Sequence, residues 1–432
     1  MAVVLCLVIN SPQSVFAEKF WTLQAVVRQA REETPEVRVA ALRMQVAKAQ
    51  LAQANSALWP HFQLQSGYLR TDSPVQSFGN ILNQRSFSSS IDFNDVPITD
   101  NFVGRGMLSF PLYVGGQNSA RIDGARAHLR AMELQEEVVA RDYAVQAAST
   151  FFEIVKAREV MKSVESSVRA FEANEKAVRA RFDSGAALKT ELLEVQVQLE
   201  HMREELVRAS NGHSLLVESL KSLLVVDGEA FKVSLEPVEL IVPEGDSASS
   251  QRLEVQAVQS EVHAAEARVR EAHSGYLPRV SLQGGYEYDK GWELHGDGTN
   301  YTVGVVGEWD VFNGHQTQEQ KKEANLELQA VQEGKKRLQK VVDLEKVQAR
   351  MRVEEARDAL KITKKAEKIA LESAVLTRLR FLQGLTTSTQ LIDVEHALTN
   401  ASVRRARADA DSSIAIIMLR RALNLFPIDL ER

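Results

Sequence analysis

The sequence predicts a mainly α-helical chain with membrane β-strands, built as a duplicated strand pair plus a long antiparallel coiled-coil hairpin. Three observations support this fold class. Stretches rich in Ala, Glu, Gln, Lys, Leu and Arg, with only 10 prolines among 432 residues, favour long helices. An internal repeat places two amphipathic strands before a long hairpin in each half of the chain. Heptad spacing of apolar residues in the long segments is typical of coiled coils.

Composition excludes several classes of function. The formal net charge is -6 with acids and bases interspersed, so no basic stripe could neutralise phosphates, and nucleic acid is not an expected partner. The nine histidines are scattered, and no His-Glu-x-x-His, Cys-x-x-Cys or phosphate-binding loop occurs. We therefore expect neither an enzyme nor a metal or cofactor site.

Residues 1–17 have the pattern of a secretory signal peptide, with a short apolar run followed by Val15-Phe16-Ala17. The alternative is a buried N-terminal strand. Cys6 is the only cysteine, so cleavage after Ala17 would leave no thiol for a disulfide or a zinc site. Cys6 also lacks the small preceding residue of a lipoprotein cleavage site. Beyond residue 17 no window offers the ~18 apolar residues of a membrane-spanning helix, so any spanning part must be a β-barrel.

The internal repeat shows two offsets. Pro60 to Tyr68 aligns with Pro278 to Tyr286, 218 residues further on, and the turn at Gly185 aligns with the turn at Gly384, 199 residues further on. The difference of 19 residues falls in a polar loop of the first half, residues 71–101.

This alignment predicts a first repeat over 18–226, a linker over 227–250 and a second repeat over 251–432. The predicted strands are about 61–71, 102–113, 279–289 and 300–312, and the predicted long helices are about 117–182, 188–225, 315–382 and 388–424.

The predicted strands alternate between apolar and polar residues, and each has roughly the ten residues that a tilted membrane strand needs. The residues predicted to face lipid are Phe62, Leu64, Tyr68, Phe110, Leu112, Val280, Leu282, Tyr286, Trp309 and Val311. The alternative is a soluble hairpin half-buried against a helix. Four strands cannot close a barrel in lipid, and eight from two chains would leave no open lumen. We therefore expect a homotrimer that shares a twelve-stranded barrel in a lipid bilayer.

The first long helix can run for about 65 residues, which is about 100 Å at ~1.5 Å per residue. Apolar residues follow a heptad seam along it and along the next helix, with Glu175 as a polar exception: Met161, Val164, Val168, Phe171, Val178 and Phe182, then Leu188, Leu192, Val195, Leu199, Met202 and Leu206. In the second hairpin the seam contains Leu391, Val394, Leu398 and Ala401. The two helices of each hairpin should pack antiparallel. Simple two-helix packing is the alternative, and it is compatible with the same fold.

The order of strands and hairpins, and the two Arg-Phe-x-x-Gly turns, resemble the TolC-like outer-membrane efflux and export channel family over essentially the whole mature length. The resemblance implies a trimeric twelve-stranded β-barrel continued by an α-helical periplasmic tunnel. It also implies location in the bacterial outer membrane, and passive exit for substrates of a tripartite efflux or type I export system. The implied partners are a periplasmic adaptor protein and an inner-membrane pump, whose RND, ABC or MFS type stays open, as does the substrate.

The resemblance also implies site residues. The hairpin turns, where an adaptor would dock, contain Arg181, Phe182, Gly185, Arg380 and Gly384. The periplasmic entrance would be formed by Thr190, Glu191, Phe381, Thr386, Gln390 and Asp393. Phe381 lacks the tyrosine hydroxyl of relatives, Thr386 the arginine, and Gln390 the charge, which places the entrance latch in question.

Our hypothesis for the entrance is a ring of Asp393, with Glu191, that selects for cations through threefold repetition of charge. The alternative is that both acids are ordinary favourable residues of a first helical turn. For the whole chain, the alternative function is a periplasmic coiled-coil adaptor or a structural protein of the envelope. The duplication favours the channel, because an adaptor ordinarily carries one hairpin.

Overall fold

The computed structural model describes residues 19–92, 94–226, 231–234, 240–243 and 251–428. The elements in chain order are β1 (Lys19–Trp21), α1 (Leu23–Glu32), α2 (Pro35–Ser56), β2 (His61–Thr71), α3 (Pro74–Asn83), β3 (Thr99–Tyr113), α4 (Gln117–Asp183), α5 (Lys189–Leu224), β4 (Phe231–Val233), α6 (Leu253–His273), β5 (Arg279–Lys290), β6 (Asp297–Glu308), α7 (Gln316–Leu382) and α8 (Ser388–Ala422). The signal-peptide prediction, residues 1–17, lies outside the described residues, as does most of the predicted linker.

The chain forms two compact units, and each of them draws segments from both halves of the sequence. The sheet unit comprises residues 42–134 and 254–337. The helical unit comprises the described residues of 1–41, 135–253 and 338–432.

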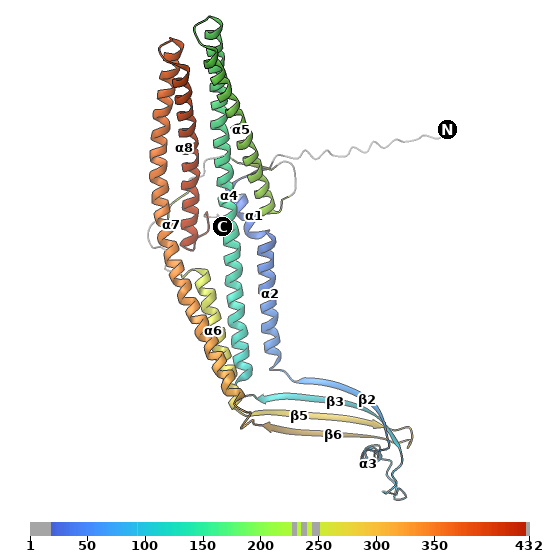
Figure 1. Cartoon of the computed structure of the whole chain (residues 1–432). Helices are drawn as coiled ribbons and strands as arrows, with labels where there is room; N and C mark the ends of the chain where they lie inside the picture. The colour runs from blue at the N-terminus through green and yellow to red at the C-terminus, as the bar shows by residue number, and fades with distance from the viewer. Residues whose placement is uncertain (1–18, 93, 227–230, 235–239, 244–250, 429–432) are drawn as a thin grey trace, which may run out of the picture. The chain divides into compact units, whose positions relative to one another are not determined.

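In the sheet unit, four antiparallel strands lie in the order β2-β3-β5-β6. Figure 1 shows that the connections to the helices of this unit leave from one end of the sheet, and that α3 and its loop lie at the other end. Two strands are therefore edges with an unpaired side, β2 and β6.

The register gives the sheet one apolar and one polar face, because directly paired residues of antiparallel strands point to the same side. One row across the sheet is Leu64, Gly106, Tyr286 and Tyr301. The next row, on the opposite face, is Gln65, Arg105, Glu287 and Asn300. The apolar face also carries other residues of the predicted set, namely Phe62, Tyr68, Phe110, Val280 and Leu282. Their common face is confirmed by the register; their contact with lipid stays a prediction.

Two predicted strand residues need correction. The strand β6 covers Asp297–Glu308 and not 300–312, so Trp309 and Val311 lie beyond it. There the Trp309 indole Nε1 donates to the Tyr276 carbonyl oxygen at 3.1 Å, and the chain turns toward α7. Leu112 lies within β3, as predicted, but it has no partner in the β3–β5 register, which shifts at Pro111. A proline removes a ladder donor, so a bulge at this point has a physical cause.

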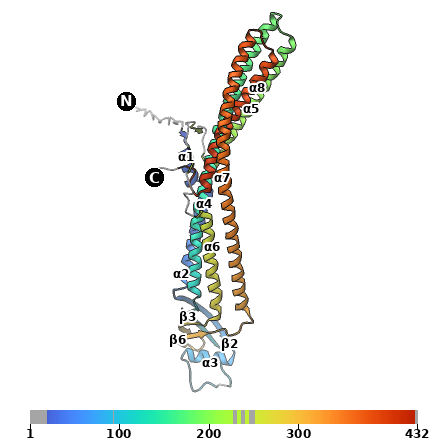
Figure 2. The ribbon, with the colours of Figure 1, turned by 90° about the vertical axis from the view of Figure 1, so that its left-hand side faces the viewer.

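In the helical unit the long helices form two hairpins, α4–α5 and α7–α8, which lie side by side (Figure 2). The helices α4 and α7 each have 67 residues, and α5 and α8 have 36 and 35. The seam predicted for the first hairpin is buried over most of its length, at Val164, Val168, Phe171, Val178, Val195, Leu199 and Met202. Leu188 is the exception, because it caps the start of α5 at the turn and is exposed.

The buried stripe of α8 differs from the predicted one. It contains Leu391, Ile392 and Glu395, whereas Val394 and Leu398 are only partly buried. The reason is that α8 packs against two neighbours, its own α7 and the first hairpin, so a two-helix heptad does not fix which residues are covered.

A second core surrounds the amphipathic helix α1, whose Val26, Val27 and Ala30 pack with Phe151 of α4 and Leu220 of α5. A two-stranded parallel sheet closes this core where β1 pairs with β4. The strand β4 lies inside the predicted linker and was not expected.

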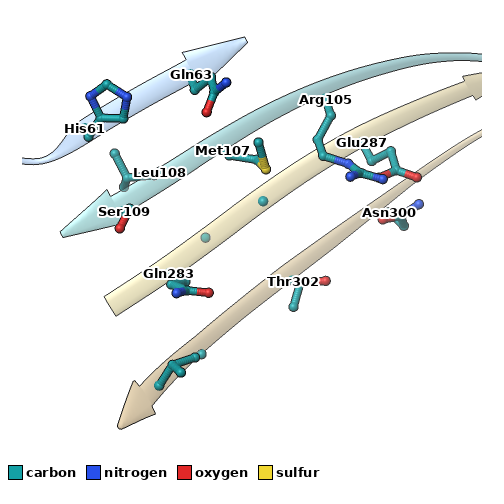
Figure 3. Close-up of a pocket in the computed structure, with 14 residues that line it drawn as sticks. His61, Gln63, Arg105, Met107, Leu108, Ser109, Gln283, Glu287, Asn300 and Thr302 are labelled. Carbon is teal, nitrogen blue, oxygen red and sulfur yellow. The ribbon is translucent and has the colours of Figure 1, made fainter. Parts of the chain in front are cut away.

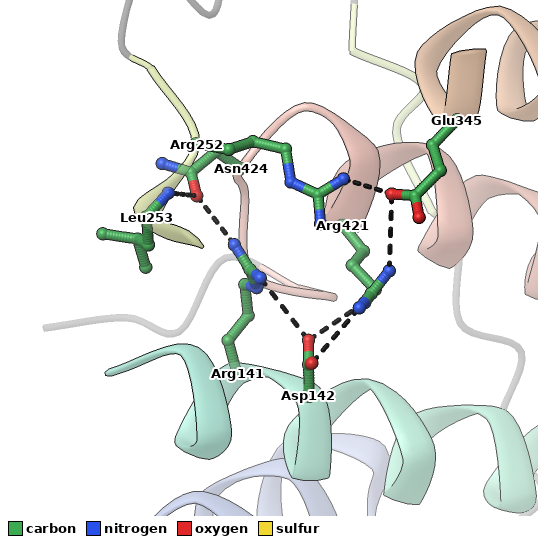
Figure 4. A network of polar contacts seen from close by, with 7 residues as sticks. All are labelled: Arg141, Asp142, Arg252, Leu253, Glu345, Arg421 and Asn424. Carbon is green, nitrogen blue, oxygen red and sulfur yellow. Dashed lines mark hydrogen bonds and ion pairs between the residues drawn. The ribbon is translucent and has the colours of Figure 1, made fainter. Parts of the chain in front are cut away.

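A polar network joins the start of α6 to α4, α7 and α8 within the helical unit (Figure 4). Its members are Arg141, Asp142, Arg252, Leu253, Glu345, Arg421 and Asn424. The side-chain oxygen of Asn424 accepts from buried Arg141 at 2.7 Å and from the Leu253 backbone N–H at 3.2 Å. Asn424 has φ of 64°, a left-handed conformation that Asn tolerates at a helix end. One residue thus ends α8 and fixes the entry of the chain into α6.

No helix in the part of the chain described here is long and apolar enough to cross a bilayer.

Candidate functional site

The candidate site is the end of the two hairpins, where the turns have the same backbone geometry. Gly185 and Gly384 have φ of 77° and 76°. The residue after Gly185 donates its N–H to the Arg181 carbonyl at 2.7 Å, and the residue after Gly384 donates to the Arg380 carbonyl at 2.9 Å. This six-to-one bond with a glycine in the left-handed region is the Schellman ending of a helix. The Arg-Phe-x-x-Gly spacing therefore has a local physical cause.

Phe381 lies in the core between the hairpins. Its side chain is 3% exposed and packs in a cluster with Val178, Val195 and Leu391. The Arg181 guanidinium carbon lies 5.0 Å from the centre of its ring, and Arg181 Nη1 donates to its carbonyl oxygen at 3.5 Å. We expected Phe381 to line the entrance. Its burial does not fit that role, and the residue instead ties the second turn to the first hairpin.

The other predicted entrance residues are accessible. Thr190, Gln390 and Asp393 are exposed, and Glu191 and Thr386 are half-buried. The structure brings two of them together, since the Thr386 hydroxyl donates to the Gln390 side-chain oxygen at 2.5 Å. Among the residues that the structure describes, no hydrogen bond or ion pair joins Glu191 to Asp393.

A buried ion pair, which was not predicted from the sequence, joins α7 and α8 near the second hairpin turn at Gly384. Arg378 of α7 binds Glu395 of α8 through two contacts of 2.5 and 2.6 Å, and Glu395 is only 2% exposed. The hydrogen bonds to Glu395 raise the pKa of Arg378. The sequence signal for this ion pair was Glu395 itself, an acid directly after Val394 of the predicted apolar seam.

Polar contacts also join the two hairpins. His396 of α8 has Nε2 3.0 Å from the Gln198 side-chain oxygen and its ring 5.2 Å from that of Phe171. Burial lowers the pKa of His396, with a further contribution from His201 and an opposing one from Asp393. The hairpins therefore carry a histidine with a lowered pKa at their interface.

Glu175, the polar exception in the first seam, is paired across its own hairpin. Gln196 of α5 donates to its carboxylate at 3.0 Å, and Arg179 lies one turn along α4. The hydrogen bond from Gln196, followed by that from Arg179, lowers the pKa of Glu175. The carboxylate is thus accommodated without an uncompensated charge.

A sheet with one apolar face and paired helical hairpins, carried by one chain, define a class of membrane-channel subunits. A model of the outer membrane efflux protein family matches residues 26–224 and 245–425. The chain belongs to this family.

The chain is similar along nearly its whole length to the outer membrane protein TolC of Vibrio cholerae, with 23% identity over 429 residues, covering 95% of this chain and 91% of that protein. Among solved structures it is similar to a membrane protein from Pseudomonas aeruginosa, with a TM-score of 0.83, 16% identity, and coverage of 95% of this chain and 91% of that one. It is also similar to the outer membrane protein VceC of Vibrio cholerae, with a TM-score of 0.79, 15% identity, and coverage of 95% and 97%.

The protein is accordingly an outer-membrane efflux channel protein that extends into the periplasm, and it is not an enzyme. The family match confirms the resemblance to TolC-like outer-membrane channels that the repeat and the turns indicated. The alternative of a periplasmic adaptor loses its support.

Proposed function

We propose that three copies of this chain close a twelve-stranded barrel in the outer membrane, and that their hairpins continue it as a tunnel for substrates of a tripartite efflux or export system. The observation that carries the proposal is the open four-stranded sheet. Because β2, β3, β5 and β6 are antiparallel in this order, the two edge strands run in opposite directions. The β6 edge of one copy can then pair with the β2 edge of the next in the same antiparallel sense. Open edges are not tolerated in lipid, so closure is required.

The apolar face of the sheet supports contact with lipid. Leu64, Tyr286, Tyr301 and Val303 are all exposed in the single chain and lie close together in the register. Soluble proteins rarely expose such a contiguous apolar surface. The 11 residues of β2 span about 28 Å across a membrane at ~3.3 Å per residue and a tilt of ~40°. This length suits the hydrocarbon core of a bilayer.

Aromatic residues flank that band, as they do in membrane barrels. At the helix end of the strands Trp59, Trp309 and Phe312 are exposed, and at the loop end Tyr68 and Trp292 are exposed and in contact, with ring centres 5.8 Å apart. Trp309 thus keeps a place at the membrane boundary in this proposal, although it lies outside β6.

The opposite face would line the lumen. Figure 3 shows polar side chains from all four strands on this face. Among them, Arg105 Nε of β3 donates to the Glu287 carboxylate of β5 at 2.5 Å. Gln63, Asn300 and Thr302 line the same hollow as this pair. Such a surface is compatible with a water-filled passage and incompatible with hydrocarbon.

The hairpins of both halves would form the tunnel wall as equivalent repeats, residues 18–226 and 251–432. The equal lengths of α4 and α7 support this, since both tips then reach the same level. At the tips Leu188, Leu382 and Leu385 are exposed. We propose that an adaptor docks on these residues and on the turns at Gly185 and Gly384, and links the channel to an inner-membrane pump.

The assembly is tested by fractionating the cell envelope, extracting the protein in detergent and measuring its native mass, with a heat-modifiability gel alongside. A trimer in the outer-membrane fraction supports the proposal. A monomer or dimer of the extracted, folded protein contradicts it.

The entrance hypothesis is tested on the reconstituted trimer. If Asp393 repeats around a threefold axis at the constriction, Asp393→Asn lowers cation selectivity in a planar bilayer. Glu191→Gln tells whether the first hairpin contributes. Unchanged cation selectivity in the Asp393→Asn trimer would contradict the entrance hypothesis and leave Asp393 only the role of a favourable acid near the start of α8.

A further inference from the structure

The connection between β2 and β3, residues 72–98, differs in kind from the connection between β5 and β6, residues 291–296. The longer one carries α3, and the two are packed together at the loop end of the sheet. The extra residues of the first half therefore form a folded element, although their Ser, Asn and Asp content is typical of a plain loop.

Hydrogen bonds fix the end of α3 to the sheet. Gln84, which is 1% exposed, donates to the Asp100 carbonyl oxygen at 2.7 Å and to the Asn101 side-chain oxygen at 3.0 Å. Asn101 in turn donates to Asp289 at 2.6 Å. Asn101 and Asp289 have the same alternation along their strands as Arg105 and Glu287, so they belong to the polar face. The α3 segment is thus anchored on that face.

Three glycines make room for this segment. A Cβ at Gly298 of β6 would lie 2.0 Å from the Asn83 carbonyl oxygen. At Gly291 it would lie 2.1 Å from the Gln84 side-chain oxygen, and at Gly296 it would lie 1.8 Å from Ser86 Oγ. Real Cβ atoms do not come this close. At Gly298 and Gly296 a Cβ would meet backbone oxygens, of Asn83 at 2.0 Å and of Gln84 at 2.6 Å, so these two positions need glycine for the contact, whereas at Gly291 the Gln84 side chain would have to move. Gly298 pairs with Asp289, so the direction of its absent Cβ independently places the segment on the polar face.

The side of α3 that points away from the sheet carries two apolar residues beside the polar Gln76 and Asn83. Ser77 and Ile81 are buried against the sheet unit, whereas Val75 is 83% exposed and Leu82, seven residues later on the same side, is also exposed. At about 100° per residue, these two lie roughly 100° to 160° around the helix from the buried pair.

We propose that α3 folds into the barrel lumen and narrows its loop-side mouth, so that this helix sets the size limit for solutes that leave the channel. The proposal rests on the proposed function, in which the polar face lines the lumen. Each copy contributes one helix of about 10 Å diameter, so three project toward the axis and present Val75 and Leu82 there.

The test uses a single cysteine on the lumen face, Gln63→Cys in a Cys6→Ser background, in intact cells. Labelling rates are compared for a small water-soluble maleimide and for a maleimide on a bulky polyethylene glycol, neither of which crosses the outer membrane directly. Two variants release α3. One replaces residues 72–98 with the 291–296 segment, and the other, Gly298→Leu, pushes Asn83 off the sheet at unchanged chain length. The matched control is Gly304→Leu, on the same face of β6 but with no atom within 4 Å of the site of its Cβ.

In the parent the small reagent labels the introduced thiol and the bulky one is excluded. Both variants should raise the bulky-to-small rate ratio several-fold, and Gly304→Leu should leave it unchanged. If neither folded variant changes the ratio, the inference about α3 is wrong while the channel stands. Leu64→Cys, on the opposite face of the sheet, tests whether the lumen face was assigned correctly. If Leu64→Cys is labelled and Gln63→Cys is not, the proposed lumen and lipid faces are reversed, and both proposals fail.

Discussion

Arginine at one of two neighbouring positions of β6 tests which face of the sheet meets lipid. Val303 and Thr302 lie near the middle of the strand and point to opposite faces. Both are exposed in the single chain, Val303 at 70%. In a soluble sheet, Val303→Arg and Thr302→Arg would therefore each have little effect. Any difference between them must come from what surrounds the sheet in the assembly.

The magnitude follows from the cost of a cation in hydrocarbon. An arginine on the lipid face near the bilayer midplane costs about 2–4 kcal/mol per chain, which is roughly 30- to 900-fold in the folding equilibrium constant. An arginine on the lumen face stays in water, next to the existing Arg105–Glu287 pair, and should cost less than about 0.5 kcal/mol. The expected difference between the two variants is thus well outside measurement error.

The assay is denaturant unfolding of the protein folded into lipid vesicles, with both variants compared with the parent. A penalty confined to Val303→Arg supports the assignment of the faces. Equal penalties, or a larger one for Thr302→Arg, would refute the reasoning.

Three further predictions concern the hairpins. Arg378→Ala leaves Glu395 buried without its cation and should cost about 3 kcal/mol in a denaturant titration, more than the double variant with Glu395→Gln; a small loss would show that water replaces the arginine. Burial lowers the pKa of His396 in the folded protein, so the contribution of this residue to stability is complete above about pH 6.5, the pKa of an unfolded histidine, and is lost as the pH falls through the lower pKa of the folded state. His396→Gln should therefore flatten the pH dependence of the melting temperature below about pH 6.5. An unchanged slope would contradict this. Gly384→Ala should destabilise the turn by about 1 kcal/mol, whereas Gly334→Ala inside α7 should stabilise; two effects of the same sign would exclude the backbone explanation.

Local patterns in the sequence were sufficient for much of the fold. The period-two strands, the uninterrupted helices and the glycine turns each depend on residues close together in the chain, and the register of β2, β3 and β5 agrees with the predicted apolar face. The end of β6 was missed by four residues, because Trp309 and Val311 continue the alternation after the ladder has stopped. The alternation of apolar and polar residues describes only where side chains point. A strand ends where its backbone hydrogen bonds to the neighbouring strand end.

The missed features all depend on contacts between distant segments. Burial of Phe381 follows from the meeting of the two hairpins, whereas a heptad pattern describes contacts within one hairpin only. Glu395 is buried and paired with Arg378 of the facing helix α7. The placement of α3 depends on glycines about 200 residues away, at Gly291 and Gly298. For the entrance, the family's pattern supplied positions but could not tell an exposed acid such as Asp393 from a buried one such as Glu395.

The matched length of α4 and α7 constrains how this protein can change. Each residue inserted into one helix advances its tip by about 1.5 Å, so an unpaired insertion would slide Arg181 away from the ring of Phe381. A seven-residue insertion restores the facing sides of a coiled coil but still displaces one tip by about 10 Å. Insertions and deletions in these helices should therefore be tolerated only when both arms of both hairpins change by the same length. A designer who wants a longer or shorter tunnel has to edit α4 and α5, and also α7 and α8, which begin 199 residues further on.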